Sequence, residues 1–201
     1  MKIFVVFSHH DTQRSFNAHI RDTFISEAKA CGHEIDLVNL FEEQEQLPFY
    51  SSDINPPPPL VLSYRKRLEA ADAMFLISPC HNLRLNAIME NWIDWVLHPT
   101  WFFTYRSILP NSPYFKNYGY PVAGAMKGKL GIVSITYGGP MISYFNFSIF
   151  DNIPYRRIKK SVFQLGGLKT RYLRFYSVLP AMDKRVFTKH MDKVKALARS
   201  L

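Results

Sequence analysis

Residues 3–17 read Ile3-Phe4-Val5-Val6-Phe7-Ser8-His9-His10-Asp11-Thr12-Gln13-Arg14-Ser15-Phe16-Asn17. The stretch opens with an unbroken apolar run, continues through a polar segment and reaches Ser15, where a helix can begin. Continuous apolar residues are typical of a strand that is buried on both faces, and serine is a favoured helix N-cap. We therefore predict a buried strand, a polar loop and the N-terminus of a helix, in that order.

The junction between this loop and its helix can bind an anion. The first backbone N–H groups of a helix lack intrahelical partners, and the aligned peptide dipoles add partial positive charge there. The loop has neither the glycines of a dinucleotide-binding fingerprint nor the Gly-Lys-Ser/Thr of a P-loop. Its side chains that can donate hydrogen bonds to phosphate are Ser8, His9, His10, Thr12, Arg14 and Ser15. A phosphate site is one interpretation, and an ordinary loop capped by Ser15 is the other.

The composition is that of an ordinary globular protein, since 47% of the 201 residues are hydrophobic and 20% are charged. We expect a single domain spanning residues 1–201. No window approaches the roughly 18 apolar residues of a membrane-spanning helix, so we expect no integral membrane segment. The two cysteines, Cys31 and Cys80, lie far apart in the sequence and suit a reducing compartment, which predicts a cytoplasmic protein.

The formal net charge is +9, and basic residues gather beside one predicted helix and along the last one. They are Arg156, Arg157, Lys159, Lys160, Lys184, Arg185, Lys189, Lys193, Lys195 and Arg199. A solvated basic face accounts for them, and the sequence contains no recognised nucleic-acid-binding module. We therefore expect no nucleic-acid partner, although a basic nucleic-acid binder stays as a third functional class. The positive field favours anionic cofactors and substrates.

Predicted helices and strands alternate along the rest of the chain. The predicted helices cover residues 15–31, 61–71, 86–97, 154–165 and 182–200, and the later strands cover 34–40, 73–77, 129–136 and 171–178. Apolar strands separated by helices indicate an α/β fold with a parallel sheet that is covered on both faces. In such a doubly wound sheet, ligands bind beyond the carboxyl ends of the strands. The candidate site is therefore formed by residues 8–17, 78–85 and 136–144.

Four segments share their order and spacing with one known family. They are Ser8-His9 leading to Ser15-Phe16-Asn17, Ile77-Ser78-Pro79 followed by Asn91-Trp92-Ile93-Asp94-Trp95-Val96, Trp101-Phe102-Phe103-Thr104-Tyr105, and Lys127-Gly128-Lys129 leading to Thr136-Tyr137-Gly138-Gly139. On these segments the chain resembles the NAD(P)H:quinone oxidoreductases of the flavodoxin-like fold. The resemblance implies a doubly wound five-stranded parallel sheet, a bound flavin that is FMN or FAD, and NAD(P)H as co-substrate.

The resemblance also assigns roles to individual residues. It implies that the flavin phosphate and ribityl chain are surrounded by His9, Ser15, Phe16 and Asn17. It implies that the isoalloxazine ring lies along Pro79, Cys80, His81, Asn82 and Leu83, and that its other edge is closed by Thr136, Tyr137, Gly138 and Gly139. By the same resemblance, Tyr144 stabilises negative charge on the reduced ring. The resemblance also implies that Phe103 and Tyr105 line the nicotinamide and quinone pocket, often across a dimer interface.

Two positions depart from the family pattern. The family commonly has a tryptophan or another aromatic residue in the loop after the third strand, where this chain has Cys80-His81-Asn82. Some members pair the tyrosine with a histidine, and this chain has Phe150 at that position. The departures leave an alternative open, in which the chain is a degenerate relative that acts as a regulatory or accessory subunit, for example of a potassium efflux system.

These observations predict a flavin-dependent NAD(P)H dehydrogenase that reduces quinones or related electrophiles by ping-pong hydride transfer. We expect no metal, because His9, His10, His81 and His98 form no helical i, i+4 pair and lack a carboxylate partner. We expect a homodimer, because the aromatic and proline-rich insertion at 99–120 holds more apolar surface than a monomer ordinarily exposes.

Overall fold

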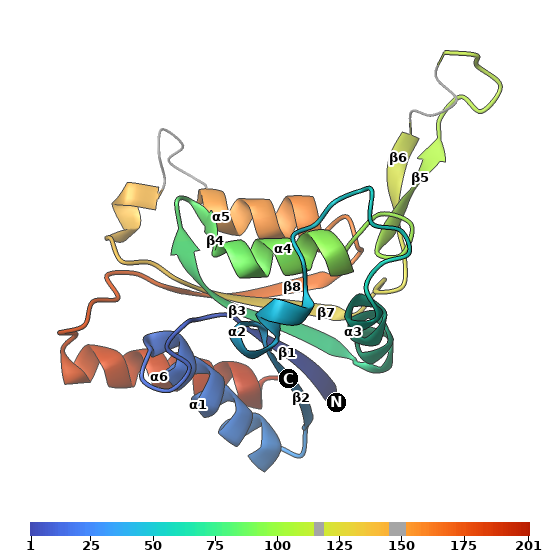
Figure 1. Cartoon of the computed structure of the whole chain (residues 1–201). Helices are drawn as coiled ribbons and strands as arrows, with labels where there is room; N and C mark the ends of the chain where they lie inside the picture. Colours follow the sequence, from blue (N-terminus) through green and yellow to red (C-terminus); the bar gives the residue numbers. More distant parts are fainter. Residues whose placement is uncertain (115–118, 145–151) are drawn as a thin grey trace.

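A computed structural model describes residues 1–114, 119–144 and 152–201 of the chain. Its centre is a parallel sheet in the order β2-β1-β3-β7-β8 (Figure 1). The strands are β1 (Lys2–Phe7), β2 (Glu34–Asn39), β3 (Ala73–His81), β7 (Leu130–Thr136) and β8 (Lys169–Phe175). The five-stranded parallel sheet confirms the predicted doubly wound α/β fold.

Helices cover both faces of this sheet (Figure 1). One face is covered by α1 (Phe16–Ala30) and α6 (Lys184–Arg199), and the other by α3 (Pro59–Ala70), α4 (Ala87–Val96), α5 (Ile153–Arg156) and the π-helical segment η3 (Arg157–Phe163). Successive side chains of a strand point to opposite faces, so each strand contributes to both cores. Ile3 and Val5 of β1 pack with α1 and α6, whereas Phe4 and Val6 pack on the opposite side.

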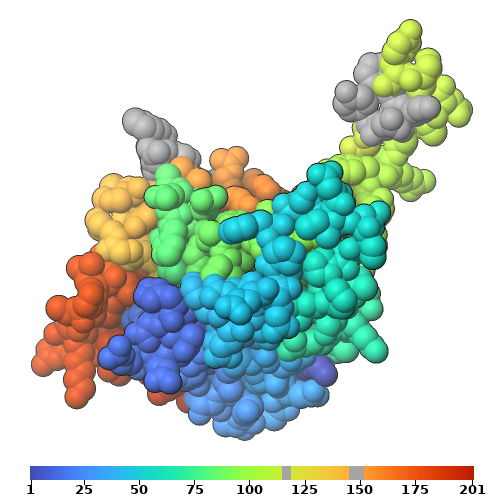
Figure 2. All heavy atoms as spheres, viewed as in Figure 1, coloured from blue at the N-terminus to red at the C-terminus, as the bar shows by residue number. Residues whose placement is uncertain are grey.

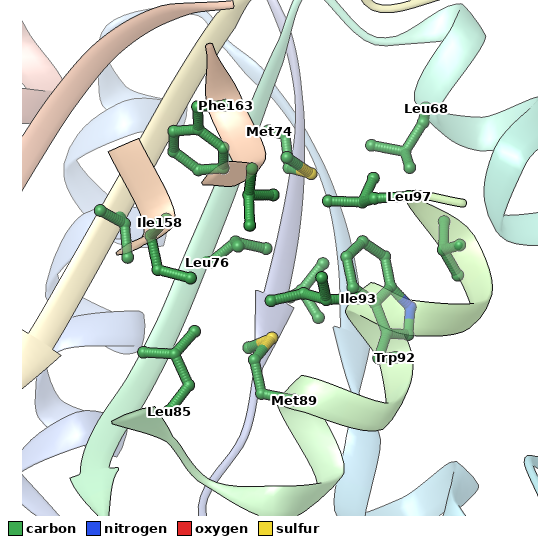
Figure 3. Packing of buried hydrophobic residues seen from close by; sticks show 14 of the residues in the cluster. Leu68, Met74, Leu76, Leu85, Met89, Trp92, Ile93, Leu97, Ile158 and Phe163 are labelled. Carbon is green, nitrogen blue, oxygen red and sulfur yellow. The ribbon is translucent and has the colours of Figure 1, made fainter. Parts of the chain in front are cut away.

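The core between the sheet and α4 helps to explain why the strands are continuous apolar runs in the sequence. Met89 and Trp92 of α4 lie against Met74 and Leu76 of β3 (Figure 3), and all four side chains are fully buried. Phe163 of η3 closes the same cluster from the neighbouring segment. The other face of β3 is buried in the core on the α1 and α6 side, so neither face of this strand can carry a row of polar side chains.

Several element boundaries differ from the sequence predictions. The prediction that the third strand ends at Ile77 is wrong, because β3 continues to His81 and pairs with the antiparallel β4 (Arg84–Leu85). Asn82 and Leu83 form the connecting turn with φ values of 49° and 59°, which matches a two-residue hairpin. The predicted helix at 154–165 is α5 continued by the π-helical η3, and the predicted strand at 171–178 lies earlier, at Lys169–Phe175.

The long connections contain short elements that the sequence did not predict. After β2 come α2 (Leu40–Glu43) and a 3₁₀ turn, η1 (Gln44–Gln46), and a second 3₁₀ turn, η2 (Met141–Tyr144), follows β7. In the insertion at 99–120, β5 (Phe103–Ser107) pairs with β6 (Gly119–Ala123), and this arm projects from the body (Figures 1 and 2). In the ranges that the structure describes, no helix is both long and apolar enough to cross a membrane.

Candidate cofactor-binding site

A cavity of about 510 Å³ lies at the carboxyl ends of β1, β3, β7 and β8. Its lining residues are His9, His10, Asp11, Arg14, Ser15, Phe16, Asn17, Pro79, Cys80, His81, Thr136, Tyr137, Gly138, Val178, Leu179 and Pro180. The three segments singled out from the sequence therefore meet in one space. Asn82, Leu83, Gly139 and Tyr144 lie on these segments but outside the lining.

Ser15 is the N-cap of α1, as the sequence predicts. Its Oγ accepts a hydrogen bond from the Ala18 backbone N–H (3.1 Å) and donates one to the Asp11 carbonyl oxygen (2.6 Å). In the described part of the chain, the backbone N–H groups of Phe16 and Asn17 have no partner, as is usual for a first helical turn. An anion at this position can therefore be bound by main-chain donors.

Ser8 does not face this site, which corrects its inclusion among the phosphate donors. The residue is completely buried, and its Oγ donates to Asn86 Oδ1 at 2.7 Å. Asn86 Nδ2 donates in return to the Ser8 carbonyl oxygen at 3.0 Å. Thr12 also lies outside the lining of the cavity. The Ser8–Asn86 pair instead fixes the start of the loop to the N-terminus of α4.

Asp11 places a carboxylate inside the anion-binding loop. Its Oδ1 accepts hydrogen bonds from the backbone N–H groups of Arg14 (2.8 Å) and Gln13 (3.2 Å). These two bonds are the main reason why the pKa of Asp11 lies below its usual value. The Arg14 guanidinium is 3.7 Å from Asp11 Oδ2 and offsets part of the charge. An incoming phosphate therefore meets a like charge in the loop.

His9 supplies a neutral hydrogen-bond donor beside this loop. Its Nδ1 lies 3.0 Å from the Asp11 backbone nitrogen and 3.2 Å from the Asp11 carbonyl oxygen, and it accepts from that N–H in the tautomer with the ring proton on Nε2. Burial lowers the pKa of His9, and the neighbouring His10 lowers it further, since the two rings stack with centroids 4.5 Å apart. The ring is consequently neutral near pH 7, and in the tautomer protonated on Nε2 it presents an Nε2–H donor.

Asn17 joins the first turn of α1 to the end of β7. Only 2% of the residue is exposed, and its Nδ2 donates to Thr136 Oγ1 at 2.9 Å. Its Oδ1 is buried and has no hydrogen-bond partner in residues 1–114, 119–144 and 152–201. A buried acceptor without a donor is costly, so this oxygen fits a ligand that brings a hydroxyl or an N–H group.

The opposite wall of the cavity comes from the ends of β3 and β7. Pro79 is the sheet neighbour of Thr136, and the half-buried Cys80 follows it. Burial raises the pKa of the Cys80 thiol, which is therefore protonated near pH 7. A Cβ atom at Gly138 would meet no heavy atom within 4 Å among the described residues beyond its chain neighbours, so the space beside its backbone allows a flat ligand to approach closely.

Tyr144 lies at the end of η2 and reaches back to the glycine loop. Its ring centroid is 4.5 Å from that of Tyr137, and its Oη accepts a hydrogen bond from the Gly139 N–H. Phe150, the other position that departs from the family pattern, lies outside the described residues. The Tyr144 O–H remains able to donate to a ligand.

Phe103 and Tyr105 do not line this cavity within one copy of the chain. Both belong to β5 in the arm, and their rings meet at 5.5 Å. The prediction that they line the ligand pocket therefore requires the arm of a second copy.

Val178, Leu179 and Pro180 are lining residues that the sequence analysis missed. They follow β8, so the rule that selected the other loops applies to them as well. They were missed because only the loops after the first, third and fourth strands were selected from the sequence, and Val178 was assigned to the last strand. No three His, Cys, Asp or Glu side chains gather as a metal site would require in the portion of the chain that the structure covers.

Comparison with known proteins places the chain in a family. The chain is 34% identical over 71 residues to a NAD(P)H:quinone oxidoreductase of Solanum tuberosum, a match covering 34% of each protein. It is 30% identical over 95 residues to an NAD(P)H-dependent FMN reductase of Pseudomonas aeruginosa, covering 45% of this chain and 44% of that one. The matches thus span less than half the length of these curated relatives.

The similarity in fold extends over the whole chain. The structure of a NAD(P)H:quinone oxidoreductase from Methanothermobacter marburgensis superposes with a TM-score of 0.78 at 16% sequence identity, covering 100% of this chain and 96% of that one. The profile of the flavodoxin-like fold matches residues 1–196. The chain therefore belongs to the flavodoxin-like fold family.

Proposed function

We propose that this protein is a flavin-dependent NAD(P)H oxidoreductase that reduces quinones or related electrophiles. The observation that carries the proposal is the cavity at the strand ends, where the N-terminus of α1 and the open backbone at Gly138 border one space. The two relatives, a NAD(P)H:quinone oxidoreductase and an NAD(P)H-dependent FMN reductase, support the same chemistry. Family membership supports a flavin, because this fold offers a ligand crevice at that edge of the sheet.

We propose FMN as the cofactor, with its phosphate at the N-terminus of α1. The donors are the backbone N–H groups of Phe16 and Asn17 and the Nε2–H of His9. The buried Oδ1 of Asn17, which lacks a partner in the described residues, fits a ribityl hydroxyl. FMN is favoured over FAD because the Pseudomonas relative is an NAD(P)H-dependent FMN reductase.

The isoalloxazine ring is assigned to the space between two segments, 79–83 and 136–139. Bound flavin would supply hydride acceptance from NAD(P)H and hydride donation to the acceptor, and a single pocket used in turn gives a ping-pong order. The chain's residues then bind and orient the ring, and the Tyr144 O–H donates a hydrogen bond as negative charge develops on it.

We further propose a homodimer in which the arm of one copy covers the cavity of the other. The arm exposes large apolar side chains, namely Tyr105, Ile108, Leu109, Tyr114 and Tyr120. A second copy would shield them and bring Phe103 and Tyr105 to the substrate side of the cavity. The two free cysteines, Cys31 and Cys80, support a reducing, cytoplasmic location.

A regulatory or accessory subunit is the second candidate function. Two features favour it: the Asp11 carboxylate in the phosphate loop, and the absence of an aromatic residue from the Cys80-His81-Asn82 segment. Both weaken flavin binding, the first through repulsion and the second through lost ring contact.

One experiment separates the two candidates. The purified protein is titrated with FMN and FAD, and the complex is then mixed with NADPH or NADH in the absence of oxygen. The enzyme proposal predicts stoichiometric bleaching of the bound flavin and recovery of its colour on addition of a quinone. If neither flavin binds, the enzyme proposal fails and the accessory subunit replaces it.

A further inference from the structure

Asn152 links three segments that meet behind the cavity. The residue caps α5 and is 1% exposed, and its Oδ1 accepts hydrogen bonds from the Tyr155 backbone N–H (3.0 Å) and from Tyr137 Oη (2.7 Å). Its Nδ2 donates to Tyr176 Oη at 3.1 Å. A single amide therefore ties the segment after β7 to the segment after β8 and to the start of α5.

Tyr137 is fixed through both its side chain and its main chain. Its fully buried ring stacks on Tyr176, with centroids 4.7 Å apart and planes 17° apart. Burial is the main cause that raises the pKa of Tyr137, so its phenol stays protonated and donates to Asn152. Its backbone N–H donates to Phe175 O (2.8 Å), and its carbonyl accepts from Val178 N–H (2.9 Å).

The two glycines that follow depend on this anchorage. Glycine has wide backbone freedom, so Gly138 and Gly139 hold one conformation only if their flanks are fixed. Gly139 is held by Ser177 N–H, which donates to its carbonyl at 2.9 Å, and by the Tyr144 hydroxyl. On the other flank, Tyr137 is the residue that holds Gly138.

We propose that Asn152 is a positioning residue that acts through the Tyr137 phenol to hold the backbone of residues 137–139 in the shape that receives the ligand. Asn152 does not line the cavity itself, so it influences binding through the residues that it holds, and of these Tyr137 is the one that lines the cavity. Holding the loop in the bound conformation before binding lowers the entropy lost when the ligand arrives. The identity of the ligand as FMN rests on the proposed function.

The test uses variants that remove this link in different ways. Asn152→Leu removes all three hydrogen bonds, and Tyr137→Phe removes only the one between the two residues. Asn152→Asp retains both accepted bonds and loses only the donation to Tyr176. Asn39→Leu is the matched control, because Asn39 is also a buried N-cap asparagine, bonded to Phe41 N–H and to Glu42 Oε1 and outside the cavity.

Two readouts are measured for each variant: amide hydrogen exchange at residues 137–139 without flavin, and the Kd for FMN. We expect Asn152→Leu and Tyr137→Phe each to speed the exchange and to raise the Kd about tenfold, the effect of losing one buried hydrogen bond. The double variant should be no worse than Asn152→Leu alone, Asn152→Asp should restore the Kd to within about threefold of wild type, and Asn39→Leu should match wild type.

The proposal is overturned if folded Asn152→Leu protein keeps wild-type exchange and Kd, or if the two substitutions have additive effects. Should Asn152→Leu fail to fold, the milder Tyr137→Phe decides alone, and unchanged exchange at residues 137–139 contradicts the proposal. If wild-type protein does not bind FMN, the proposed function fails, while the exchange measurement still tests the role of Asn152.

Discussion

The hydroxyl oxygen of Tyr144 accepts a hydrogen bond of 3.0 Å from the backbone N–H of Gly139. This contact holds the phenol against the glycine segment that borders the cavity, and it leaves the hydroxyl proton available for a second acceptor. The tyrosine is therefore held beside the cavity before any ligand is present.

Tyr144→Phe tests the role proposed for this proton. A donor that acts mainly as charge develops affects turnover more than binding, so flavin reduction should slow about tenfold or more while the Kd for FMN stays nearly unchanged. One hydrogen bond to developing charge is worth about 1.5–3 kcal/mol, which sets this scale. Stopped-flow reduction by NADPH compares the two proteins. Equal rates would remove Tyr144 from the chemistry.

Ser15→Asp tests the phosphate position. Aspartate caps helices as well as serine does, so the fold should persist, but the added charge should repel a phosphate at the α1 N-terminus. The Kd for FMN should rise at least about tenfold. Riboflavin, which lacks the phosphate, should bind both proteins equally. Ser15→Asn, a neutral cap, should retain FMN affinity, and equal weakening of riboflavin and FMN would contradict this position.

Asp11→Asn tests the opposing charge in the same loop. Asparagine keeps an Oδ1 acceptor for the Gln13 and Arg14 amides and removes the negative charge. FMN should bind several-fold more tightly, and the gain should shrink as salt is added. Titrations at low and high ionic strength measure this effect. Weaker binding at both salt concentrations would show that the loop needs the carboxylate itself.

The depressed pKa of His9 predicts how stability varies with pH. The unfolded state takes up a proton near pH 6.5, and the folded state resists protonation until a lower pH. The free energy of unfolding should therefore decrease as the pH falls from about 6.5 through the lower folded-state pKa. His190, whose pKa burial also lowers, acts in the same direction.

His9→Gln isolates the contribution of His9 from that of His190. Urea unfolding is measured for both proteins between pH 8 and pH 5. The free energy of unfolding should fall more on acidification for the wild type than for the variant. An equal fall in both proteins would mean that folding does not lower the pKa of His9.

The arm predicts the oligomeric state. Ile108 and Leu109 are each more than half exposed near its tip, at 63% and 53%. The wild type should sediment as a dimer at micromolar concentration, and Leu109→Asp should shift it toward monomer. Ser26→Asp, at an exposed position of α1 on the side of the sheet away from the arm, makes the same change of charge and serves as the control. A wild type that is monomeric with flavin bound would contradict the dimer.

The fold could be predicted because the runs 3–7 and 73–77 are apolar on both faces and each is followed by a segment with helical periodicity. The extension of β3 to His81 could not, because Ser78-Pro79-Cys80-His81 mixes polar residues with a proline that breaks the apolar pattern. The strands of the arm were missed for a related reason, since no buried face imposes alternation on them.

Much of the site followed from one rule, that loops at the carboxyl ends of parallel strands converge. The links that shape it were not predictable in this way. The Asn152–Tyr137 bond joins residues 15 positions apart, and the Asn17–Thr136 bond joins residues 119 positions apart. Such contacts depend on how α5 and α1 pack on the sheet, which no local pattern specifies.

The central claim is that FMN binds at the carboxyl edge of the sheet with its phosphate on the first turn of α1. A crystal structure of the protein grown with FMN measures this most directly. The account predicts the phosphate within hydrogen-bond distance of the Phe16 and Asn17 backbone N–H groups, a ribityl hydroxyl on Asn17 Oδ1, and the ring beside Gly138. Flavin bound elsewhere, or this cavity left empty at saturating FMN, would contradict it.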